Sequence, residues 1–285
     1  MLGTYKTVQK TIELDSFTPI TIWFFGDVHR DTRACDVNRW KWFLDRAKKC
    51  PKETTYYIGM GDMHDFASTR EKKTIENELH ETTIEKFDYI AERENRAFMR
   101  EIGFMRGHTL GLIEGNHYWK FQDGTTTTED LAKRLDTEYL GWLCHYSLTF
   151  KFGAGKSATV HLVLCHGRRA GGKTMGITVN QVDDLCRIFP IADIYVQGHD
   201  HQRFARPKSV LYPTHGGGTY SLKQKRQFLC RSGSFKKAYL ENEMTYESKM
   251  LFQPSDLGAL RLDIGFHRDR EGGTDRLITD IEATI

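Results

Sequence analysis

The stretch TIWFFGDVH, from Thr21 to His29, decides the fold class of this chain. Its first five residues, Thr21 to Phe25, form a short apolar run that is typical of a buried strand. The run ends at Gly26, and Asp27 and His29 follow directly. Ligands in layered α/β folds bind where strands end, so this stretch predicts such a fold with a metal site at a sheet edge.

Four further fragments place metal-ligating side chains after an expected strand end. They are Gly61-Asp62, Gly115-Asn116-His117, His166 and Gly198-His199-Asp200-His201. With Asp200 set aside, the five fragments offer two carboxylates, one amide oxygen and five imidazoles. These donors are enough for two adjacent divalent cations, with one imidazole left for acid chemistry. Oxygen and imidazole ligands without thiolates favour Mn, with Fe, Zn or Ni as alternatives.

The composition is that of an ordinary globular protein, with 39% hydrophobic and 28% charged residues and a net charge of +3 over 285 residues. No apolar run approaches the roughly 18 residues of a membrane span, so no membrane partner is expected. Residues 1–14 lack the apolar core of a signal peptide. The six cysteines are scattered without a C-x-x-C pair, which indicates thiols and a cytoplasmic location. The sequence indicates no oligomeric state.

Strand and helix patterns alternate in the first half of the chain. Residues 55–60 and 109–114 are further apolar runs, and residues 37–48 have helical spacing. Residues 71–102 form a long charged stretch that predicts one helix or two. The second half carries more strand signals, several of them short, and one helical pattern at residues 178–188. Without an internal repeat or a linker, residues 1–285 are expected to form one domain.

The five fragments, in order, resemble the calcineurin-like metallophosphoesterase superfamily, whose pattern is D-x-H, G-D, G-N-H, a lone H and G-H-x-H. The resemblance implies a four-layer fold, a double β-sandwich flanked by helices. It also implies two metal sites that share Asp62. The first would be formed by Asp27, His29, Asp62 and His201, and the second by Asp62, Asn116, His166 and His199. His117 would protonate the leaving alcohol or stabilise transition-state charge.

The second fragment departs from the protein-phosphatase branch of that superfamily. There it reads G-D-x-V-D-R-G, whereas here Gly61-Asp62-Met63-His64-Asp65-Phe66 lacks the arginine that clamps a phosphomonoester. The sequence is more similar to the phosphodiesterase and DNA-repair nuclease branches. A phosphodiesterase is therefore expected, and a phosphomonoesterase acting on phosphoproteins or small metabolites is the alternative. His64 and Asp65 are candidates for outer partners of the metal ligands.

A basic stretch follows the last metal ligands. Residues 202–238 contain nine Lys and Arg residues and no Asp or Glu, with aromatic residues between them. This pattern predicts contact with a nucleic acid or nucleotide substrate close to the metals, with Arg203 among the contacts. A solvated basic surface is the alternative.

Residues 167–174, GRRAGGKT, also satisfy the P-loop pattern G-x-x-x-x-G-K-[ST]. The following Met175-Gly176-Ile177-Thr178 is a poor start for the helix that a P-loop requires. We therefore expect a basic loop beside the metals, in which Arg168, Arg169 and Lys173 bind substrate phosphate.

Overall fold

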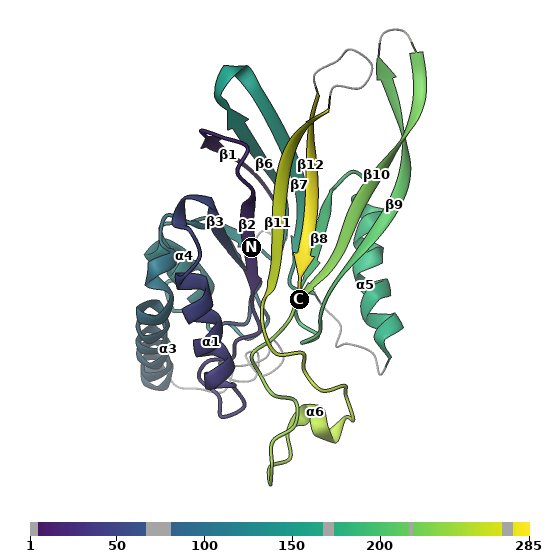
Figure 1. The fold of residues 1–285 in the computed structure, drawn as a ribbon. Helices are drawn as coiled ribbons and strands as arrows, with labels where there is room; N and C mark the ends of the chain where they lie inside the picture. Colours follow the sequence, from purple (N-terminus) through teal and green to yellow (C-terminus); the bar gives the residue numbers. More distant parts are fainter. Residues whose placement is uncertain (1–4, 67–80, 168–173, 217–218, 270–275) are drawn as a thin grey trace.

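Two six-stranded sheets pack against each other, and helices cover their outer faces (Figure 1). The structure is a computed structural model that describes residues 5–66, 81–167, 174–216, 219–269 and 276–285. The expected four-layer architecture is confirmed. Within the described residues, no helix has the length and apolar character needed to cross a membrane.

The first sheet has the order β12-β11-β2-β3-β4-β5. Its strands are β2 (Ile20–Phe25), β3 (Thr55–Gly59), β4 (Thr109–Ile113), β5 (Tyr139–Gly141), β11 (Leu260–Asp269) and β12 (Arg276–Thr284). The strands from β2 to β5 are parallel, whereas β11 and β12 pair antiparallel. The carboxyl ends of β2, β3 and β4 therefore reach the same edge of this sheet.

The second sheet has the order β1-β6-β7-β8-β10-β9. Its strands are β1 (Lys6–Leu14), β6 (Leu143–Phe152), β7 (Lys156–Cys165), β8 (Ile194–Gln197), β9 (Arg203–Gly216) and β10 (Thr219–Ser232). Because β7, β8 and β10 are parallel neighbours, their carboxyl ends also lie together. The two 14-residue strands β9 and β10 form an antiparallel hairpin, where only short strands were expected.

Three apolar clusters hold the four layers together. One fills the space between the sheets and includes Phe24, Tyr146 and Val196. A second lies under the helices that cover the first sheet, α1 (Val37–Lys48), α3 (Glu81–Ile102) and α4 (Thr127–Leu135). The third lies between the second sheet and α5 (Met175–Ile188). Short helices complete the chain: η1 (Lys52–Thr54), η2 (Gly103–Met105), η3 (Gly153–Gly155) and α6 (Tyr246–Lys249).

Two helices test the expectations from the sequence directly. Of the long charged segment at residues 71–102, residues 81–102 form the single helix α3, and residues 71–80 lie outside the described part. Helix α5 begins at Met175, so the expectation that residues 175–178 disfavour a helix start was wrong. Helix propensity is a weak preference, and burial of Thr178, Val182 and Leu185 against the sheet overrides it.

Candidate metal centre

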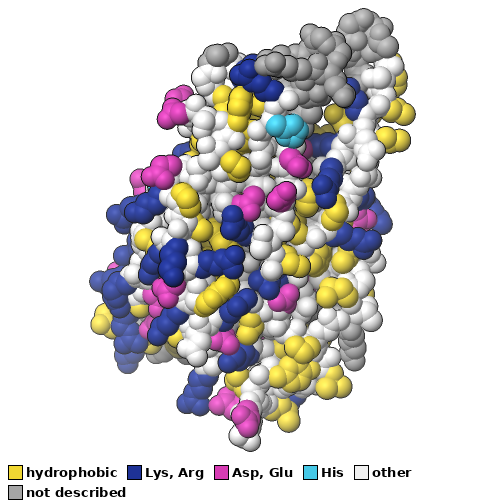
Figure 2. Space-filling model, viewed as in Figure 1, with side chains coloured by type: hydrophobic (Ala, Val, Ile, Leu, Met, Phe, Trp, Pro, Cys, Tyr) yellow, Lys and Arg dark blue, Asp and Glu magenta, His cyan; other side chains and the backbone are white. Residues whose placement is uncertain are grey.

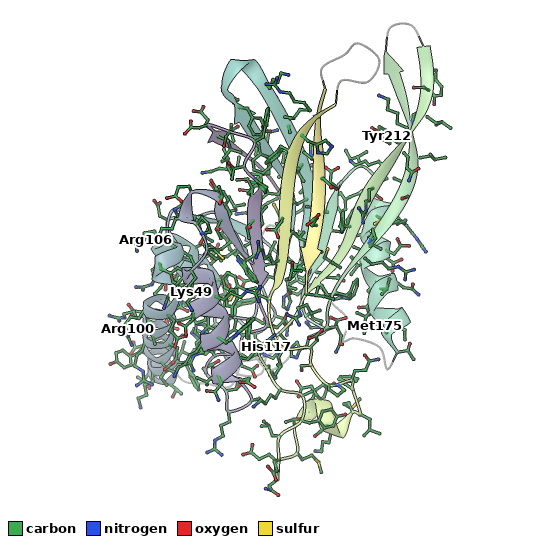
Figure 3. The ribbon with its side chains drawn as sticks, viewed as in Figure 1. Lys49, Arg100, Arg106, His117, Met175 and Tyr212 are labelled. Atoms are coloured by element: carbon green, nitrogen blue, oxygen red, sulfur yellow. The ribbon has the colours of Figure 1, made fainter. Side chains whose placement is uncertain are left out.

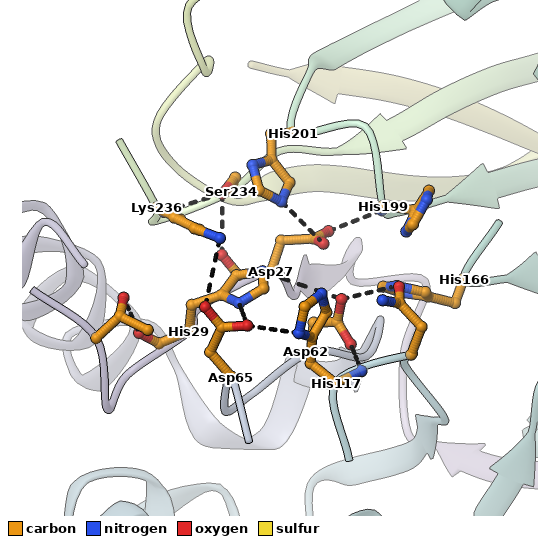
Figure 4. A network of polar contacts seen from close by, with 12 residues as sticks. Asp27, His29, Asp62, Asp65, His117, His166, His199, His201, Ser234 and Lys236 are labelled. Carbon is orange, nitrogen blue, oxygen red and sulfur yellow. Dashed lines mark hydrogen bonds and ion pairs between the residues drawn. The ribbon is translucent and has the colours of Figure 1, made fainter. Parts of the chain in front are cut away.

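The strand ends of both sheets bring the predicted ligands to one place (Figure 4). Asp27 follows β2 and Asp62 follows β3, while Asn116 follows β4. From the second sheet, His166 follows β7, and the loop after β8 carries His199 and His201. One hydrogen bond links the two sheets directly at this point: the backbone N–H of His199 donates to Asp27 Oδ2 at 2.9 Å.

The first ligand group consists of Asp27, His29 and His201, whose ligand atoms lie within 4.8 Å of one another. Asp27 Oδ1 is 3.5 Å from His201 Nε2. Asp27 Oδ1 and His29 Nε2 are buried without a hydrogen-bond partner among the described residues. Such atoms are costly to bury, and a cation bound between them would satisfy both. The group therefore fits a divalent metal.

The second group consists of Asp62, His166 and His199, again within 4.8 Å. His166 Nε2 lies 3.0 Å from Asp62 Oδ2 and 3.1 Å from Asn116 Oδ1, so two oxygens face one ring nitrogen. Nδ1 of the same ring is 2.8 Å from the Met60 carbonyl, an arrangement in which Nδ1 donates and Nε2 is left for a ligand. The site thus needs either a proton or a metal ion at Nε2.

The protonation states follow from burial and neighbouring charge. Burial opposes the charged form of His166, but the charge of Asp62 and its hydrogen bond raise the pKa of His166 to about 9. Burial alone would raise the pKa of Asp62, but the charge of His166 and its hydrogen bond hold this pKa well below its usual range. Burial lowers the pKa of His199 to about 3 and that of His201 well below its ordinary value. These two rings are neutral, which is the form that binds metals.

Backbone strain is concentrated at the predicted ligands. Eight non-glycine residues in the described chain have positive φ, and five of them belong to this site. Their φ angles are 47° at Asp27, 45° at His29, 48° at Asp62, 76° at His199 and 58° at His201. A non-glycine residue in this region costs about 1–3 kcal/mol and persists where the surroundings enforce it, typically at functional sites.

Close backbone approach explains one glycine of the site. A Cβ atom on Gly115 would lie 1.9 Å from Asp62 Oδ1 and 2.3 Å from the Asp62 nitrogen. No side chain fits there. Only glycine lets the loop after β4 bring Asn116 next to Asp62.

His117 lies beside the two ligand groups and is held by Asp65. Its Nδ1 is 2.5 Å from Asp65 Oδ1, and its backbone N–H donates to Asp62 Oδ1 at 2.9 Å. Burial lowers the pKa of His117, but the hydrogen bond to Asp65 and the charge of Asp62 outweigh this and raise it. Asp65 thus contacts His117 and lies 3.4 Å from His29 Nδ1, and its role as an outer partner of a metal ligand stays a prediction. His64 is buried next to Phe98 instead, and burial lowers its pKa to about 4.

The predicted substrate-binding residues are less well defined. Arg168, Arg169 and Lys173 lie outside the described residues. Arg203 donates to Asp256 Oδ1 at 3.1 Å and to the Ala259 carbonyl at 3.5 Å, which are contacts within the protein. A role for Arg203 toward substrate stays a prediction.

Much of the basic stretch lies away from the candidate metal centre, contrary to expectation. Figure 3 places Tyr212 high on the hairpin, far from His117 in the lower middle of the molecule, because β9 and β10 lead away from the site. Lys208 and Lys225 pair with Asp183 and Asp193 at 2.5 and 2.8 Å. Figure 2 shows Lys and Arg side chains over α1 and α3 as well as along the hairpin.

Two residues after β10 reach the site and were not predicted as part of it. The Ser234 hydroxyl donates to the Asp27 carbonyl at 2.9 Å. Lys236 Nζ lies 3.4 Å from Asp65 Oδ2. In the sequence, Ser234 belongs to a turn of small residues and Lys236 is one of nine basic residues in its stretch. Only the fold shows that these two residues reach the site.

Comparison with known proteins shows distant structural likeness only. No family model and no curated protein matches the sequence. Vps29 from Entamoeba histolytica, solved in complex with Zn²⁺, is 12% identical over 92% of this chain and 99% of its own, with a TM-score of 0.36. A predicted phosphoesterase from Streptococcus pneumoniae is 11% identical over 92% and 99%, with a TM-score of 0.31. At these values the likenesses carry no argument about activity or metal.

Proposed function

We propose that this chain is a dinuclear-metal phosphoesterase that hydrolyses phosphodiester bonds in nucleic acid or nucleotides. The observation that carries the proposal is the position of Asp62 between the two ligand groups. Its Oδ2 atom lies 3.0 Å from His166 Nε2 and 3.9 Å from His29 Nε2. A carboxylate in that position is able to serve two ions at once.

The residues fit two divalent cations, for which Mn is the first candidate and Fe, Zn and Ni are alternatives. The first would be held by Asp27, His29, Asp62 and His201, and the second by Asp62, Asn116, His166 and His199. When bound, such a pair polarises the phosphoryl group and lowers the pKa of a nearby water. The protein contributes the fixed arrangement of ligands, several of them in enforced left-handed conformations.

His117 is proposed to be the acid that protonates the leaving oxygen. Its Nδ1 is occupied by Asp65, so Nε2 is the nitrogen available to carry a proton to substrate. The raised pKa of His117 keeps that proton in place near neutral pH. An alkyl leaving group requires this proton because an alkoxide is a poor leaving group.

The preference for a diester rests on Phe66, which replaces the arginine expected in phosphomonoesterase relatives. The test compares Mn²⁺-dependent hydrolysis of a bis-aryl phosphodiester, an aryl phosphomonoester, and single-stranded and duplex DNA. Diester cleavage that chelator abolishes supports the proposal, and DNA cleavage supports the substrate class. Hydrolysis of the monoester alone would replace the proposal with the phosphomonoesterase alternative.

A further inference from the structure

Lys236 joins two carboxylates that come from distant parts of the chain. Its Nζ atom lies 3.4 Å from Asp65 Oδ2 and 3.2 Å from Glu247 Oε1. The side chains of Lys236, Asp65 and Glu247 are only 14%, 18% and 14% exposed. Bulk water therefore screens these charges little, because protein surrounds all three side chains.

The main chain of Lys236 is fixed as firmly as its side chain. Its backbone N–H donates to Ser234 Oγ at 2.9 Å, and that hydroxyl donates to the Asp27 carbonyl at 2.9 Å (Figure 4). Glu247 belongs to α6, in a segment that docks on the site through a hydrogen bond from the Asp256 backbone to the His201 carbonyl, 2.9 Å long. Lys236 is therefore anchored from both sides.

The two oxygens of Asp65 have separate partners. Oδ1 faces His117 Nδ1 at 2.5 Å and His29 Nδ1 at 3.4 Å, and Oδ2 faces Lys236. Burial lowers the pKa of Lys236, but Asp65 and Glu247 raise it above its ordinary value, so the side chain is cationic. A cation held on Oδ2 fixes the rotation of the carboxylate, which in turn aims Oδ1 at the His117 ring.

We propose that Lys236, held in place by Glu247, is a positioning residue that fixes the Asp65 carboxylate and thereby the orientation of His117. Its effect on turnover rests on the proposed function, whereas its effect on the His117 ring does not. Loss of an outer partner that orients a functional side chain typically costs about 10–100-fold in activity.

The test follows the His117 ring directly. In protein labelled with ¹⁵N-histidine and freed of metal, the Nδ1–H proton shared with Asp65 is observed by NMR and assigned by its loss in His117→Ala. Lys236→Met should broaden or abolish this signal, and Lys236→Arg should preserve it. Lys237→Met is the matched control, because Lys237 pairs with Asp36 at 3.1 Å and not with Asp65.

Kinetics supply the second arm, in protein shown to hold the wild-type metal content. Lys236→Met should lower kcat about 10–100-fold for a diester with an alkyl leaving group, leave KM unchanged, and affect an aryl diester much less. Should Lys236→Met fail to fold, Glu247→Gln, which weakens the hold on Lys236, should show the same changes in smaller measure.

The proposal is overturned by an unchanged Nδ1–H signal in Lys236→Met. It is also overturned if this variant raises KM while kcat stays unchanged, because that result would mean that Lys236 contacts the substrate. Failure of Lys236→Arg to preserve the signal would overturn it as well. A wild-type protein that hydrolyses no phosphoester contradicts the proposed function, and the NMR arm then still decides the positioning role.

Discussion

Arg231 and Asp200 form an ion pair of 3.2 Å in the interior, where their side chains are 1% and 0% exposed. Arg231 also donates to the Gly198 carbonyl at 2.5 Å and to Gln181 Oε1 on α5 at 2.7 Å. One buried cation therefore fixes the loop that presents His199 and His201. Asp200, the one acidic residue of that fragment not assigned as a ligand, has this structural partner.

Arg231→Met should lower the free energy of unfolding by about 3–5 kcal/mol, because it leaves Asp200 buried without its counter-ion. Urea denaturation of the metal-free protein measures the change. Combining it with Asp200→Asn should cost less than the sum of the two single variants. Arg187→Met is the control, since Arg187 is 77% exposed and its pair with Asp184 is on the surface. Equal effects of the two arginine variants would contradict this role.

Asp62→Asn should abolish binding of both metal ions, because Asp62 is placed to serve both ligand groups. Metal analysis after dialysis measures ions per chain. Asp136→Asn is a matched control: Asp136 also has positive φ, 54°, but it ends α4 away from the ligands, and asparagine tolerates that conformation. Two ions retained by Asp62→Asn would refute the bridging assignment.

His117→Ala should leave metal content unchanged and reduce turnover of an alkyl phosphodiester by about 10²–10⁴-fold. An aryl diester should suffer less, since its leaving group needs no proton. The comparison of the two substrates measures the acid role. His267→Ala, at an exposed position of β11, serves as the control and should behave as wild type. Equal losses on both substrates would exclude general-acid catalysis by His117.

Stability of the metal-free protein should fall as pH rises from about 6.5 to about 9. The pKa of His166 is raised in the folded state from 6.5 to about 9, so its protonated form stabilises the fold. That contribution is complete below pH 6.5 and disappears as pH passes through the folded pKa. Thermal unfolding across this range, in chelator, measures it. His166→Gln should flatten the profile, and an identical slope in both proteins would contradict the assignment.

The sequence predicts the strand ends that carry the candidate ligands better than it predicts the sheets as a whole. Asp27, Asp62 and His166 were placed correctly at strand ends, because a buried apolar run followed by a ligand is visible in a single segment. Strand β1 was missed because Ile12 is its only buried residue, so the strand shows no alternation of apolar and polar residues. The length of the β9–β10 hairpin was missed for a similar reason: much of it is exposed, and pairing between strands holds it.

Contacts between distant segments were beyond single-sequence reasoning. Lys236 and Asp65 are 171 positions apart, and nothing local to either residue indicates the other. The same holds for Arg231, which appears as one of many basic residues until the fold places it against Asp200. Charge composition predicted that the basic stretch contacts substrate close to the metal site. In the structure, Lys208 and Lys225 pair with aspartates instead, and the hairpin carries other basic residues away from the candidate metal centre.

The most direct test of the dinuclear account is a stoichiometric titration of Mn²⁺ into chelator-stripped protein while hydrolysis of a bis-aryl phosphodiester is followed. The account predicts that activity rises until two equivalents are bound and that excess chelator abolishes it. Full activity at one equivalent, or no hydrolysis at any loading, would contradict it.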